Sequence, residues 1–89
     1  MNFNTDQLKF ADIILRTANG AHPEYFTYKR LDYTWCSDED KIEVVDYLHM
    51  KKIIDNLGLN NNNNSIKLLK TGQHILDKYG SFSTYYKEL

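Results

Sequence analysis

The chain has 89 residues, of which 42% are hydrophobic, 13% aromatic and 26% charged. This length fits a single domain, and the composition is typical of a globular protein, which excludes a disordered, collagen-like or membrane-embedded chain. Twelve acidic and eleven basic residues give a net charge of −1, so any binding to nucleic acid has to depend on local clusters of basic residues.

One cysteine, Cys36, is present, and a single thiol excludes both an internal disulfide and a cysteine-rich zinc site. The N-terminal residues lack the basic and apolar regions of a signal peptide, and no stretch approaches the roughly 18 apolar residues of a membrane span. We therefore expect a cytoplasmic protein that does not contact a membrane.

The first predicted element is a helix over residues 5–18. Asn4 and Gln7 have the spacing of a capping box, and apolar residues follow at helical spacing. The pair Asn19-Gly20 favours a left-handed helix end, because these residue types tolerate positive φ.

The next segment predicts a short extended piece at 25–26 and a second short helix over 27–33. A third helix has the clearest start in the chain, at Ser37, because Asp40 occupies the third position and acidic residues fill the first turn. This helix extends to about residue 51, and its apolar stripe consists of Ile42, Val44, Val45 and Leu48.

Two β-rich stretches, 53–59 and 65–69, predict a hairpin around the asparagine-rich run 60–64. A fourth helix follows and ends at Gly80. The aromatic segment 81–89 predicts one or two further helical turns.

The order helix, strand, helix, helix, hairpin, helix resembles the winged helix-turn-helix family, and two segments carry the likeness. Ser37–Ile54 is similar to the third helix of the family running into the first wing strand, and Ile66–Leu76 resembles the second wing strand followed by the leucine-threonine-x-x-glycine start of the next helix. The resemblance implies one mainly α domain with a small β-hairpin (α+β) over residues 1–89, with a wing tip at 60–64 and an additional C-terminal helix within 81–89.

In this family the third helix lies in the DNA major groove and the wing contacts phosphate or the minor groove. The resemblance therefore implies a DNA-binding transcriptional regulator. Carried over by position, the groove-facing residues are Glu39, Glu43, Asp46, Tyr47 and Met50, and the wing-tip residues are Asn61, Asn62 and Asn63. The basic residues available to contact phosphate are Lys29, Arg30, Lys52, Lys67 and Lys70.

Three acidic residues on the third helix oppose this interpretation, because a groove lined by phosphates repels them. An alternative is a winged-helix module that binds another protein through the acidic and aromatic face of that helix, or through the aromatic C-terminal segment. The asparagine run likewise has two interpretations, contact with bases or phosphates and a flexible hairpin tip. Lys67 and Lys70 either contact phosphate or simply face solvent.

The C-terminal aromatic residues Phe82, Tyr85 and Tyr86 have the spacing i, i+3, i+4 and form one helix face. That face packs on the first helix or meets a second chain, and Phe3 and Phe10 are its partners in either case. Since the terminal helices of winged-helix regulators often form the dimer, the resemblance implies a homodimer.

Residues with catalytic or metal-binding chemistry are few. The three histidines, at 22, 49 and 74, lie on different predicted elements and lack the i, i+4 spacing of two ligands on one helix, so we expect no metal site. Cys36 has no recognisable partner motif, and we interpret it as a structural residue. No phosphate loop, paired-carboxylate motif or nucleophile elbow is present, so we expect neither an enzyme nor a cofactor.

Overall fold

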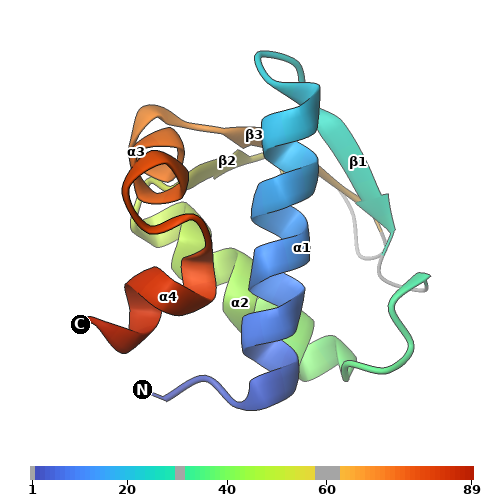
Figure 1. Ribbon diagram of the computed structural model, residues 1–89. Helices are drawn as coiled ribbons and strands as arrows, with labels where there is room; N and C mark the ends of the chain where they lie inside the picture. Colours follow the sequence, from blue (N-terminus) through green and yellow to red (C-terminus); the bar gives the residue numbers. More distant parts are fainter. Residues whose placement is uncertain (1, 30–31, 58–62) are drawn as a thin grey trace.

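The structure is a computed structural model that describes residues 2–29, 32–57 and 63–89, apart from the side chain of residue 63 (Figure 1). In these residues it is a mixed α+β domain of four helices and one three-stranded antiparallel sheet. The elements in chain order are α1 (Thr5–Ala21), β1 (Phe26–Lys29), α2 (Asp38–Met50), β2 (Ile54–Asn56), β3 (Asn63–Leu68), α3 (Lys70–Tyr79) and α4 (Phe82–Lys87). None of the described helices is both long and apolar enough to cross a membrane.

The predicted start of α1 is confirmed, and its predicted end is wrong. The Asn4 side chain accepts a hydrogen bond from the Gln7 backbone N–H (2.8 Å), and the Gln7 side chain accepts one from the Asn4 N–H (3.0 Å). The helix continues through Gly20 to Ala21, because Gly20 does not adopt the left-handed conformation. It ends at His22, since a residue before proline is pushed out of helical dihedrals.

The sheet has the strand order β1-β3-β2, with Phe26 opposite Ile66 and Ile54 opposite Leu68. The predicted helix over 27–33 is wrong, because residues 26–29 form β1 instead. Tyr28 is buried while its neighbours on both sides along the strand are exposed, which is the period of two that a half-buried strand requires. The predicted hairpin is confirmed as β2 and β3.

The predicted start of α2 is also confirmed, since the Ser37 hydroxyl accepts a hydrogen bond from the Asp40 N–H at 3.2 Å. Its predicted apolar stripe is partly wrong. Val44, Val45 and Leu48 are buried, but Ile42 is 44% exposed. Lys41 takes the inward position and is 2% exposed.

The core lies where α1 crosses in front of the sheet and of α2, while α3 and α4 cover one side (Figure 1). Its fully buried apolar side chains come from α1, α2, α4, β2, β3 and the residue before β2; the largest are Phe10, Phe82, Ile14, Leu15, Leu48, Ile53, Ile54, Ile66 and Leu68. This packing fixes the orientation of α2 and therefore decides which of its residues face outward.

Candidate functional site

The side of α2 that points away from the core is the candidate site. We call it the α2 outer face and define it by the exposed residues Glu39, Ile42, Glu43, Asp46 and Met50. It combines three carboxylates with two apolar side chains, of which Ile42 is 44% and Met50 78% exposed. The next exposed residue along this side is His49.

Four of the five predicted groove-facing residues lie on this face, and Tyr47 does not. The Tyr47 ring packs against Phe3 with a centroid distance of 5.1 Å and against Phe82 at 6.2 Å. Burial raises the pKa of the Tyr47 hydroxyl, which agrees with its place beside the core. Tyr47 is therefore half-buried against Phe3 and Phe82, whereas Ile42, which the apolar stripe assigned to the core, lies on the surface.

Contacts from the start of α1 hold the acidic half of α2 in place. Gln7, which is 2% exposed, donates from its side-chain nitrogen to the Glu43 carboxylate at 3.0 Å. Asn4 donates to the Asp40 carboxylate at 3.2 Å. Because the capping box fixes both Asn4 and Gln7, these carboxylates project from an ordered junction between two helices.

Lys41 is buried, so its positive charge does not offset the carboxylates of the α2 outer face. Lys41 is the only lysine or arginine from Asp38 to Met50. Its ammonium group donates to the Tyr33 carbonyl at 3.0 Å and forms an ion pair with Asp38 at 3.1 Å. As a result, no lysine or arginine of α2 reaches the outer face.

The predicted phosphate contacts do not form one cluster in the part of the chain that the structure describes. Lys52 and Lys70 lie at the end of the sheet where β2 begins and β3 ends, near the bond from the Leu69 N–H to the Ile53 carbonyl. Lys29 lies at the opposite end of β3, about 17 Å away by strand geometry. The predicted residues Arg30, Asn61 and Asn62 lie outside the described residues, as does the side chain of Asn63.

Lys67 lies on the outer surface of the central strand β3, next to its last residue, and its ammonium group is 5.4 Å from the centroid of the Tyr25 ring. The Tyr25 hydroxyl donates a hydrogen bond to Asp55, which is opposite Lys67 in the sheet. This bond raises the pKa of Tyr25 above its ordinary value. A carboxylate and an aromatic ring thus surround the central predicted phosphate contact.

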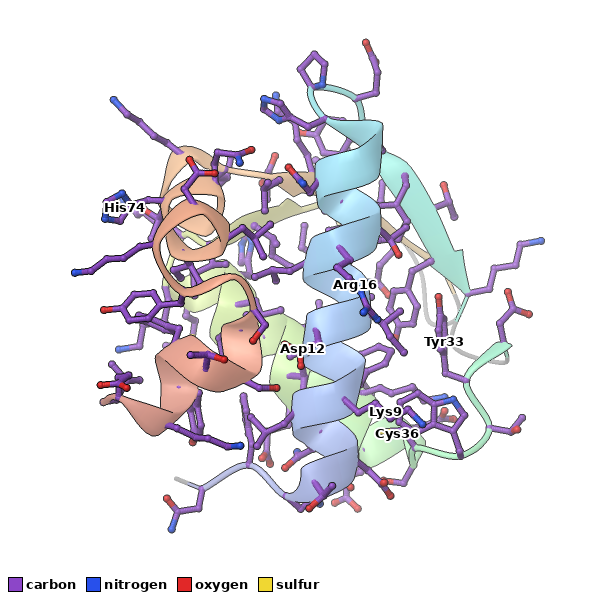
Figure 2. The ribbon with its side chains drawn as sticks, in the orientation of Figure 1. Lys9, Asp12, Arg16, Tyr33, Cys36 and His74 are labelled. Carbon is purple, nitrogen blue, oxygen red and sulfur yellow. The ribbon has the colours of Figure 1, made fainter. Side chains whose placement is uncertain are left out.

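The C-terminal aromatic residues pack within the chain. Phe3 stacks on Tyr86 with a centroid distance of 5.1 Å, and its N–H donates to the Tyr86 hydroxyl at 3.2 Å. Asp12 on α1 accepts hydrogen bonds from the backbone N–H of Ser83, at 2.9 Å, and from its hydroxyl. Figure 2 shows Asp12 pointing from α1 toward α4. Of the two alternatives for this segment, the structure shows docking on α1.

The residues predicted to form a dimer or partner surface therefore pack largely against other residues of the same chain. Phe3, Phe10 and Phe82 are buried. Phe10 does not meet the C-terminal segment as predicted, because it packs against Tyr28 and Tyr33 at 5.4 and 5.3 Å. Tyr85 and Tyr86 are half-buried and are the members of that set that keep exposed surface.

Cys36 has the surroundings of a structural thiol. It is 2% exposed, and burial, followed by the negative charge of Asp40, raises its pKa, which opposes formation of a nucleophilic thiolate. His74 on α3 lies on the other side of the molecule (Figure 2). Among the described residues, no group of three or more histidine, cysteine, aspartate or glutamate side chains has an arrangement that fits a metal ion.

Comparison of the chain with family models, with curated proteins and with solved structures finds no match. Among the described residues, those of the α2 outer face unite negative charge with exposed apolar side chains on a single helix.

Proposed function

We propose that this chain is a winged-helix domain that binds another protein through the α2 outer face. The element order supports the winged-helix assignment, since a helix and a strand precede α2, and a hairpin and a further helix follow it. One feature departs from that family pattern. Residues 32–37, between β1 and α2, form no α-helix, so α2 follows a short irregular segment rather than a second helix.

The observation that carries the binding proposal is the composition of the α2 outer face. Phosphates would be repelled by Glu39, Glu43 and Asp46, and no lysine or arginine of α2 offsets that repulsion. A protein partner gains from the same surface, because Ile42 and Met50 offer apolar area while the carboxylates select for a basic partner.

A DNA-binding regulator is the competing proposal. It is favoured by Lys52 and Lys70, which lie at one end of the sheet. The two proposals predict opposite effects when charges on α2 are reversed. If α2 binds a protein, substituting Glu43→Lys together with Asp46→Lys abolishes that binding. If α2 enters a DNA groove, the same substitutions add two cations to it and strengthen DNA binding.

The test compares the wild-type chain with this double variant and with a control, Glu24→Lys with Glu88→Lys, which makes the same charge change at exposed positions elsewhere. Each protein is cross-linked to its neighbours in the source cell and is also titrated with random duplex DNA at low and moderate salt. We expect one partner protein to be shared by the wild type and the control and lost from the α2 variant. Salt-sensitive binding of the wild type to duplex DNA that strengthens in the α2 variant would establish the DNA-binding proposal instead.

A further inference from the structure

We infer that the partner segment that covers the α2 outer face is a basic amphipathic helix of another protein. This inference depends on the proposed function and adds the chemistry and the secondary structure of the occupant. It begins from how the exposed residues are arranged along α2. Ile42, Asp46 and Met50 are spaced i, i+4, i+8 and form one ridge, and Glu39 and Glu43 form the ridge beside it.

Two parallel ridges of this kind favour a helix as the occupant. A partner helix packs its own ridge into the groove between them, as helices do in globular proteins. Ile42 and Met50 are about 12 Å apart along the axis, which corresponds to about two helical turns of a partner. A β-strand is disfavoured, because an added strand gains its affinity from the backbone groups of a sheet edge, and the backbone groups of α2 are bonded within the helix.

The charges fix the chemistry of that helix. The three carboxylates of the α2 outer face require lysine or arginine beside the apolar residues of the partner. Exposed apolar side chains at Ile42 and Met50 require that the partner also present an apolar stripe, and the flexible Met50 adapts to the shape of that stripe. A second copy of the chain fits poorly, since two identical acidic faces repel each other.

The test uses a synthetic peptide of about 18 residues with leucines along one helical face and lysines on both sides of it. A scrambled peptide has the same composition without the apolar face, and a third peptide replaces lysine with glutamate. Binding of each labelled peptide to the full chain is measured by fluorescence anisotropy, and the contact surface is located from changes in backbone amide NMR signals. The α2 variants are Glu39→Lys with Asp46→Lys, which leaves the Gln7–Glu43 bond intact, and Ile42→Ser; Glu24→Lys with Glu88→Lys is the control.

We expect the amphipathic basic peptide to bind at α2, and its affinity to fall roughly tenfold or more in the charge-reversed variant and less in Ile42→Ser. The control variant should bind it like the wild type, and the other two peptides should bind much more weakly. Equal binding of the scrambled peptide would overturn the inference, because charge alone would then explain binding.

If the amphipathic basic peptide does not bind while the α2-dependent partner is still found in cells, the inference is overturned and the proposed function stands. Absence of both would refute the two together, and self-association through α2 would show that the occupant is a second copy.

Discussion

Two glycines that lie inside helices have opposite surroundings, and the contrast gives a quantitative test of the packing between α3 and the sheet. A Cβ atom added at Gly72 would lie 2.4 Å from the Ile53 carbonyl oxygen and 2.5 Å from a Leu68 methyl carbon. A Cβ atom added at Gly20 would meet nothing within 4 Å. The Ile53 carbonyl cannot move away easily, because it accepts a hydrogen bond from the Leu69 N–H at 3.1 Å.

Alanine at either position removes the entropic cost of a helical glycine, which is about 0.5–1 kcal/mol. At Gly20 this gain stands alone, so Gly20→Ala should raise the free energy of unfolding by about 0.5–1 kcal/mol. At Gly72 the added methyl group overpacks the junction, at a cost of about 1–3 kcal/mol after the helical gain. The two variants should therefore differ by roughly 1.5–4 kcal/mol, which separates their Tm values by at least about 6 °C for a domain of this size.

Urea unfolding of both variants and the wild type is followed by circular dichroism. The slope of the free energy of unfolding against urea concentration should be the same for the three proteins, which would show that unfolding exposes a similar area in each. Thermal unfolding provides a second reading. A Gly72→Ala variant as stable as the wild type would refute the reasoning, because α3 would then not contact the turn before β2 at this distance. Equal stabilisation by both substitutions would show that helix propensity alone governs the two positions.

Three further predictions concern buried contacts. Asp12→Ala should lower the free energy of unfolding by about 1–3 kcal/mol, because it removes both hydrogen bonds to Ser83, and urea unfolding that is unchanged would show that α4 does not depend on them. Lys41→Ala should lower the free energy of unfolding by about 2 kcal/mol or more, since it leaves the Tyr33 carbonyl without this donor and empties buried volume. The control Lys51→Ala, at an exposed position, should stay within about 0.5 kcal/mol of the wild type. Because burial raises the pKa of Cys36, the folded chain should react slowly with iodoacetamide near neutral pH, and fast alkylation would contradict the assigned burial. The thiol's contribution to the free energy of unfolding should be complete below its ordinary pKa and should be lost as pH rises through the raised pKa of the folded state. The Cys36→Ala variant should not show this loss.

The starts of α1 and α2 were predictable from sequence because a cap is a local interaction. Asn4 with Gln7, and Ser37 with Asp40, form the bonds that their spacing predicts. Each bond joins residues three apart, so nothing distant in the chain decides whether it forms. The hairpin was predictable for the same reason, since β2 and β3 are neighbours in the sequence.

The continuation of β1 beyond the extended piece predicted at 25–26 was not predictable locally, because the strand exists through its pairing with a distant segment. Phe26 and Tyr28 lie opposite Ile66 and Asn64 in the sheet. A short stretch of aromatic and polar residues is compatible with a helix or a strand, and only the available edge of β3 makes the strand favourable. The end of α1 was mispredicted for a related reason, since Gly20 is a helix terminator only where the backbone takes a positive φ, and the proline after His22 ends the helix later.

The candidate site depends on one exchange between neighbouring residues. The predicted stripe took in Ile42 because it is apolar, whereas positions 41, 44, 45 and 48 have the spacing i, i+3, i+4, i+7 of one helix face, and the structure accordingly buries Lys41 and exposes Ile42. Lys41 can be buried because its alkyl chain packs like an apolar residue and its ammonium group reaches the Tyr33 carbonyl and Asp38. This arrangement has two consequences for the surface, since it buries the only lysine or arginine of α2 and leaves Ile42 exposed. The outer side of α2 is therefore acidic and partly apolar, and this surface chemistry is the basis of the proposal that α2 binds a basic protein helix rather than a groove lined by phosphates.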